Sequence, residues 1–124
     1  MDIALEAIFI DIAYMNFSAR LQQLPSVAHL AALHLQSADG QTIATLENKP
    51  GQAGSLAVYS ALATLYGGSI TPAAASLGLE WYAEHTADAH AHPGKHPNID
   101  RLVAWAGGTA SYRAQPVLAS DASN

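Results

Sequence analysis

The segment LAALHLQSADGQTIATLE, residues 30–47, decides the fold class of this 124-residue chain. Each half of it has the period-two apolar character of a strand with one buried face. Asp39 and Gly40 stand between the halves, and an Asp-Gly pair in that place is one of the strongest sequence signals of a hairpin. We therefore predict strands at 30–36 and 41–47, with a register that the sequence leaves open. The buried face of the hairpin is predicted to carry Leu33, Leu35, Ile43 and Leu46.

Helices are predicted on both sides of this hairpin. A short one at 17–24 ends at Pro25, because proline interrupts a helix. A core helix is predicted at 56–66, where apolar residues recur at helical spacing. Ser55 would be its N-cap, and the Gly67-Gly68 pair would end it.

A longer helix is predicted from Pro72 to His92. Thr71 is a suitable N-cap, and proline is favoured at the first helical position. The helix must end before the Pro93-Gly94 pair. Along it, acidic side chains four residues apart would form one ridge: Glu80, Glu84 and Asp88.

The last third of the chain predicts one more helix and one more strand. Asn98 is the expected cap of a short helix that has Asp100 in its first turn and ends near Ala106. The segment 109–117 is predicted to be a third strand. The fold class is therefore α+β: a β-hairpin plus one late strand in a small antiparallel sheet, packed against two or three helices.

The length of the chain predicts one α+β domain, which we place at residues 15–118, followed by a disordered tail at 119–124. Residues 1–14, MDIALEAIFIDIAY, are an N-terminal extension with two open interpretations. Either they form an amphipathic helix, or Met15 is the true start and the extension comes from an upstream start codon. They lack the positive region of a secretory signal and are too short to span a membrane.

The composition excludes several classes of partner. The chain has 5 Lys and Arg against 10 Asp and Glu and no basic run, which excludes nucleic acid and anionic membranes as partners. It has no cysteine, so disulfides and thiolate metal sites are excluded and a cytoplasmic location is expected. Only 12% of its residues are charged, about half the usual share. This scarcity of charge favours self-association or a protein partner.

The stretch EHTADAHAHPGKHPNID, residues 84–100, contains four of the six histidines. On a helix, His85, Asp88 and His92 share one face, as ligands of zinc or another divalent transition metal do. His90 points away from that face, and no His-Glu-x-x-His motif is present. The alternative is that His90 and His92 are solvated residues at a helix C-terminus, where histidine is favoured. We expect no cofactor, with this metal site as the alternative.

The loop PGKHPNID, residues 93–100, holds His96 between two prolines and a glycine. One interpretation makes His96 a general acid or base that works with Glu84 or His85 and with Asp100. The other makes the loop a rigid turn between two helices. Asn98 and Arg113 are the candidates for ligand binding, since an arginine beside Tyr112 can recognise a carboxylate or a phosphate.

Other catalytic patterns are incomplete. The loop KPGQAGS, residues 49–55, lacks the lysine that follows the second glycine in a phosphate-binding loop. Lys49 precedes the loop, so an anion at the next helix start remains an alternative to a plain turn. The candidate nucleophiles Ser55, Ser60 and Ser111 lie in no G-x-S-x-G elbow.

Several phrases together resemble a known family. They are GSL-x-x-Y-x-ALA at 54–63, YGG at 66–68, EHT at 84–86, PGKHPNID at 93–100 and YR-x-QP at 112–116. Over residues 20–117 the chain resembles the small bacterial proteins catalogued as domain of unknown function 2322. The resemblance implies a start near Met15 and no particular activity. It also implies that His85, His96, Asn98 and Asp100 belong to the family motif, whereas His90 and His92 depart from it.

Two hypotheses of function follow. The first is a non-enzymatic module that binds a protein partner or itself, supported by the low charge and the absence of a complete catalytic motif. The second is a small enzyme or ligand-binding protein with a histidine and carboxylate site around His85 and His96. The second hypothesis requires these two side chains to meet in space.

Overall fold

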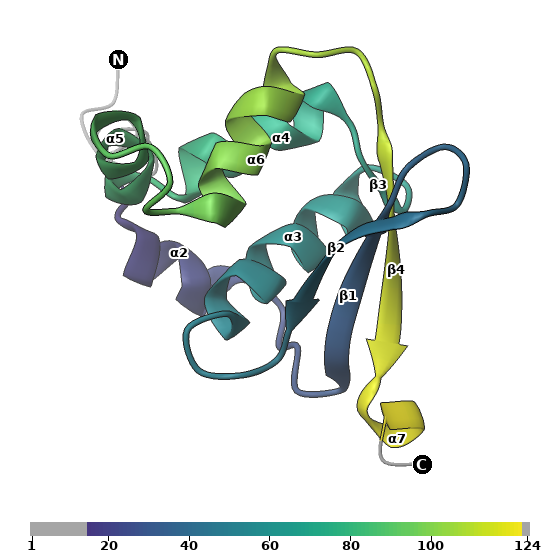
Figure 1. The fold of residues 1–124 in the computed structure, drawn as a ribbon. Coiled ribbons are helices and arrows are strands. Elements are labelled where there is room, and N and C mark those ends of the chain that lie inside the picture. The colour runs from purple at the N-terminus through teal and green to yellow at the C-terminus, as the bar shows by residue number, and fades with distance from the viewer. Residues whose placement is uncertain (1–14, 123–124) are drawn as a thin grey trace, which may run out of the picture.

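The computed structural model describes residues 15–122, and residues 1–14, with their two interpretations, lie outside this range. It confirms the α+β class, with helices gathered on one side of a sheet (Figure 1). The elements in chain order are α2 (Phe17–Gln23), β1 (Leu30–Gln36), β2 (Thr42–Glu47), α3 (Ala53–Leu65), β3 (Ser69–Ile70), α4 (Pro72–Trp81), α5 (Glu84–Ala91), α6 (Pro97–Ala106), β4 (Tyr112–Leu118) and α7 (Ala119–Ala122).

The predicted hairpin is confirmed almost residue for residue. Strands β1 and β2 pair antiparallel, and Gly40 adopts a φ of 85° in the turn between them, a conformation that favours glycine. The Asp39 carboxylate accepts hydrogen bonds from the Ser37 hydroxyl and the Gln41 amide, so this turn is fastened by its own side chains.

The buried face of the hairpin differs from the prediction at one position. Leu33, Leu35 and Leu46 are buried as expected, but Ile43 is 47% exposed and its prediction is wrong. Leu35 pairs with Ala44, so Ala44 shares the inner face and Ile43 points to the other side of the sheet. A register shift follows between Leu35 and Gln36.

The sheet has four antiparallel strands in the order β2-β1-β4-β3. Strand β4 is the predicted late strand and pairs with β1 in the middle of the sheet. Strand β3, only two residues long, has no periodicity that would reveal it in the sequence; it forms because Ser69 and Ile70 meet Arg113 and Tyr112.

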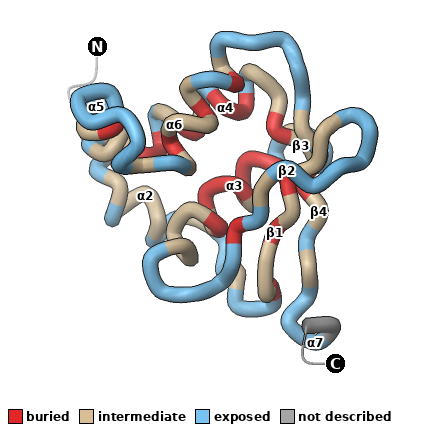
Figure 2. The backbone as a smooth tube through the Cα atoms, viewed as in Figure 1, coloured by how far each residue is buried: buried red, intermediate tan, exposed pale blue. Residues whose placement is uncertain are grey.

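Helix α3 is the centre of the core, with the sheet on one side and α4 and α6 on the other (Figure 2). Its side chains Leu56, Val58 and Leu62 are fully buried. The helix begins at Ala53, three residues before the predicted start, with Gln52 at the N-cap position. Ser55 therefore lies inside the first turn, and its prediction as N-cap is wrong.

The helix predicted from Pro72 to His92 is broken in two, so this prediction is also wrong. Its start at Thr71 and Pro72 is as predicted. Helix α4 then ends at Trp81, and α5 begins at Glu84 after Ala83, whose φ is 51°. The break gives α5 a new direction, so the acidic side chains do not form one ridge. Tertiary contacts of the buried Tyr82 outweigh the helical preference of the local sequence.

Two further differences concern the C-terminal third. Helix α6 has His96 at its N-cap position and Pro97 as its first residue, so Asn98 is not the cap. Asp100 lies in the first turn and the helix ends at Ala106, as predicted. Where a disordered tail was predicted, the short helix α7 follows β4, and the Ala119 amide donates to the carbonyl of His29.

Within the described residues, every helix is too short or too polar to span a bilayer.

Candidate functional site

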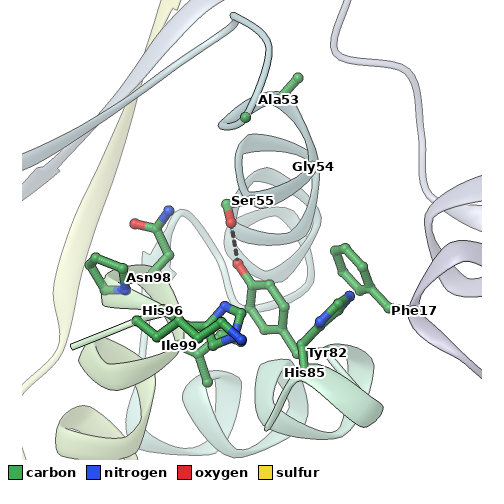
Figure 3. A pocket seen from close by; sticks show the side chains of 12 residues that line it. Phe17, Ala53, Gly54, Ser55, Tyr82, His85, His96, Asn98 and Ile99 are labelled. Atoms are coloured by element: carbon green, nitrogen blue, oxygen red, sulfur yellow. Dashed lines mark hydrogen bonds between the residues drawn. The ribbon is translucent and has the colours of Figure 1, made fainter. Parts of the chain in front are cut away.

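A pocket of about 360 Å³ lies where the first turn of α3, the start of α5 and the start of α6 converge (Figure 3). The ring of Phe17, from the beginning of α2, closes one side. The polar side chains that line the pocket are Ser55, Tyr82, His85, Lys95, His96 and Asn98. The structure therefore places His85 and His96 in one pocket, although they belong to different segments of the chain.

The two histidine rings are near neighbours. Their centroids are 5.8 Å apart with an angle of 49° between the planes. The Phe17 ring meets His85 edge-on at 5.1 Å and stacks on Tyr82, also at 5.1 Å. One wall of the pocket is thus aromatic, and His85 is held within it by ring contacts.

Asp88 fixes the His96 ring from outside the pocket. His96 Nε2 is 2.6 Å from Asp88 Oδ2, and Lys95 Nζ is 2.8 Å from the same oxygen. Hydrogen bonds from Lys95 and then from His96 hold the pKa of the Asp88 carboxyl well below its usual range. Since an ionised carboxylate only accepts, His96 Nε2 carries the proton. In the neutral ring Nδ1 then has a free lone pair, and it makes no hydrogen bond to any residue between 15 and 122.

A second hydrogen bond orients Ser55. The hydroxyl of Tyr82 donates to Ser55 Oγ at 2.7 Å, drawn as the dashed line in Figure 3. Burial raises the pKa of Tyr82 well above its usual value, so this hydroxyl stays protonated. Because Ser55 Oγ already accepts one hydrogen bond, the Ser55 proton is left to serve an acceptor in the pocket.

Asn98 is anchored by a network beneath the pocket. Arg101 Nη1 donates to Asn98 Oδ1 at 2.9 Å and to the Tyr59 hydroxyl at 3.2 Å, and that hydroxyl donates to the Asn98 carbonyl. Burial raises the pKa of Tyr59 to about 12. The network leaves the amide NH₂ of Asn98 as the free end of a side chain that lines the pocket.

Three other predicted site residues lie elsewhere. The Glu84 carboxylate accepts from the Phe17 amide at 2.7 Å, and the Asp100 carboxylate accepts from the Gly94 amide at 2.9 Å. Both therefore position backbone next to the pocket without lining it. Arg113 is an exposed residue of β4, outside the pocket lining.

The candidate metal ligands are only partly together. Asp88 and His92 form a pair at 3.2 Å, whereas His85 faces Phe17 and His96. Among residues 15–122, no three His, Cys, Asp or Glu side chains are arranged to hold a metal ion.

Sequence reasoning missed Phe17, Tyr82 and Lys95 as residues of the site. Phe17 and Tyr82 carry no local signal, because aromatic residues at helical spacing are typical of a core. Lys95 stands inside PGKHPNID, so the motif that singles out His96 already contains it. For Ser55 the sequence indicates only a nucleophile or a cap.

The fold and the pocket together define a class: a small α+β domain with a histidine-lined pocket beside the first turn of its central helix. Residues 17–116 match the model of a family described as an uncharacterized protein conserved in bacteria (DUF2322). The chain belongs to this family, which confirms the resemblance seen in its motifs. No curated protein and no solved structure matches the chain.

Three of the phrases that carry the resemblance meet at the pocket. Residues 54–56 begin one of them and supply the first turn of α3, residues 84–86 supply His85, and residues 93–100 supply Lys95, His96 and Asn98. The remaining two phrases, at 66–68 and 112–116, belong to the helix end and the strand on the far side of the core.

Proposed function

We propose that the protein binds a small molecule in this pocket and that His96, oriented by Asp88, acts there as a general base. The observation that carries the proposal is the 2.6 Å contact between His96 Nε2 and Asp88 in the wall of a pocket of about 360 Å³. A volume of this size is at the lower end of the range of ligand pockets.

The chemistry follows from the proton positions. A proton leaves the bound substrate, or a water beside it, and moves to Nδ1 of His96. The ring becomes an imidazolium, and the ionised Asp88 stabilises its charge through Nε2. Lys95 binds the same carboxylate oxygen and keeps Asp88 from rotating away from the ring.

His85 is placed to take part in the same proton transfer as His96. Its ring is 5.8 Å from that of His96 and is packed against Phe17. A second imidazole at this distance can contact the same small substrate and return a proton to it.

The proposal is tested by incubating the protein with a small-molecule extract of bacterial cells and following the extract by mass spectrometry. We expect wild type to consume at least one compound and His96→Ala to consume it at least about 100-fold more slowly, as loss of a general base implies. His90→Ala is the matched control, because His90 is an exposed histidine of α5 outside the pocket lining. Identical profiles for wild type and His96→Ala, both folded, would contradict the proposal.

Self-association is a second candidate function, and it is compatible with the first. The observation that favours it is the large exposed side chain of Ile43 on β2, an edge strand of the sheet. An apolar edge strand is a template for pairing with another chain. The absence of cysteine supports placing both activities in the reducing cytoplasm.

A further inference from the structure

The pocket is lined without a carboxylate, although the chain is acidic. The protein has a formal net charge of −5, yet the ionisable side chains that line the pocket are Tyr82, Lys95 and the two histidines, without a carboxylate. Building on the proposed function, we propose that the substrate is a small hydroxylated anion, held through its carboxylate or phosphate by Lys95 and Ser55 and presenting its hydroxyl to His96.

The acidic side chains around the pocket are already engaged. Glu84 accepts from the Phe17 amide, Asp100 from the Gly94 amide, and Asp88 from Lys95 and His96. None of them lines the cavity. Each of these carboxylates therefore accepts hydrogen bonds from residues around the cavity, and the lining itself presents donors.

The donors that face the cavity come from two sides. Lys95 lines the cavity with an ammonium that also binds Asp88 at 2.8 Å, so a bound anion would share this cation with Asp88. The Ser55 hydroxyl has a proton free to donate because its oxygen already accepts from Tyr82. The amides of Gly54 and Ser55 add to these, since neither makes a hydrogen bond to another residue in the described range. Their place in the first turn of the 13-residue helix α3 reinforces their preference for an anion.

His96 adds a requirement that a simple anion does not meet. In the neutral ring with Nε2 donating to Asp88, Nδ1 is an acceptor and would repel a carboxylate or phosphate oxygen. A hydroxyl on the same molecule satisfies Nδ1 by donating to it. The pocket thus distinguishes a hydroxylated anion from its analogue without the hydroxyl, and the reaction begins with transfer of that hydroxyl proton to Nδ1.

The test is a set of NMR titrations at constant ionic strength and at pH 8, where both phosphate monoesters are largely dianions, with four probes: acetate, glycolate, ethyl phosphate and glycerol 3-phosphate. We expect saturable chemical-shift changes of the Gly54 and Ser55 amides. Within either the carboxylate pair or the phosphate pair, we expect the hydroxylated member to bind about tenfold more tightly, because a site that pairs with a hydroxyl penalises the analogue lacking it. The carboxylate and phosphate pairs separate the two sources of the anionic group.

Two variants test whether the Lys95 side chain binds the anion. Lys95→Gln should weaken anion binding about tenfold, which corresponds to one charge-assisted hydrogen bond. Lys49→Gln is the matched control, because Lys49 forms a comparable ion pair with Glu47 at 2.7 Å but does not line the pocket. Equal effects of the two variants would overturn the proposal, as would the absence of saturable shifts with all four probes up to about 100 mM.

The two proposals can fail separately. Conversion of a compound in the extract by a route that needs His96, without binding of any of the four anions, would overturn the anion specificity and leave the general base standing. Anion binding that depends on Lys95, with no compound converted, would support the specificity and contradict the catalytic role.

Discussion

At the scale of single residues, Asp88 organises the site. One of its oxygens binds both Lys95 and His96, and the other is 3.2 Å from His92. The proposed metal ligand His92 and the proposed acid-base residue His96 therefore both contact the Asp88 carboxylate. It joins His92, at the end of α5, to His96, at the N-cap position of α6.

The pH dependence of folding should report this arrangement. The folded-state pKa of Asp88 lies below its ordinary value of 3.8, so the ionised carboxylate stabilises the fold above that pH. This stability is lost as the pH falls from about 4 through the lower folded-state value. In Asp88→Asn the contribution is absent at every pH. We expect the wild type to unfold at a higher temperature than the variant at pH 6 and the gap to narrow steadily below about pH 4.

Calorimetry across this pH range measures the effect. His90→Ala, which removes an exposed side chain of the same helix, should keep a constant offset from wild type at acidic pH below 4. A gap between wild type and Asp88→Asn that is independent of pH would show that Asp88 is not preferentially stabilised in its ionised form.

The residues of the site are predictable to different degrees. His85, His96 and Asn98 stand in motifs, and their chemistry makes them candidates from the sequence alone. The pairing of His96 with Asp88 is not predictable in that way, because it depends on the direction of α5 relative to the loop that follows it. Tyr82 and Phe17 enter the site through packing, which leaves no local trace in sequence.

At the scale of elements, the break between α4 and α5 is the decisive feature. Ala83 has φ 51° and ψ −117°, a conformation that a side chain disfavours and glycine accepts. The strain is maintained because the break lets Tyr82 pack against Phe17 and bind Ser55, while α5 turns His85 toward the pocket.

Relief of this strain gives a prediction. Ala83→Gly should raise the free energy of unfolding by about 1 kcal/mol, because the strain exceeds the entropy that glycine adds to the unfolded chain. Ala87→Gly, at an exposed regular position of α5, is the control and should lower it by about 1 kcal/mol. Chemical denaturation measures both. Destabilisation of equal size in the two variants would show that Ala83 is not strained.

The contrast between the hairpin and this break explains what the sequence could predict. The hairpin has local signals, an Asp-Gly turn and alternating strands, and its bounds agree with the prediction within one residue. The break between α4 and α5 and the strand β3 both depend on partners distant in the chain. The helical pattern of the sequence therefore continues through the break, and no local pattern marks β3. The prediction for Ile43 is wrong for a related reason, because a shift of one residue in the pairing of two strands moves a side chain to the opposite face of the sheet.

At the scale of the whole molecule, β2 and the short β3 are the two edge strands of the sheet, and β2 carries a large exposed apolar side chain. Ile43 on β2 is 47% exposed, in a chain with few charges to keep copies apart. Large exposed hydrophobic side chains are few in the described structure, and the others are Leu65 and Leu118.

Self-association through this edge can be measured directly. We expect size-exclusion chromatography with light scattering to give a mass above 12.9 kDa, and Ile43→Thr to shift the protein toward that monomer mass. Leu65→Thr is the control, since Leu65 is 63% exposed at the end of α3 and is not part of β2. A monomeric wild type at high concentration would exclude this candidate function.

The pocket has a further consequence because of where its walls come from. Phe17, the first turn of α3, the Tyr82–His85 segment and the Lys95–Ile99 segment are separated along the chain and meet only when the core has assembled. A molecule bound there ties four distant parts of the polypeptide together, and it has no site on the unfolded chain. Binding and global folding are then thermodynamically linked, with a gain in stability that grows with the logarithm of ligand concentration. In the cell, such a protein would resist unfolding and proteolysis best when a molecule that fits this pocket is abundant.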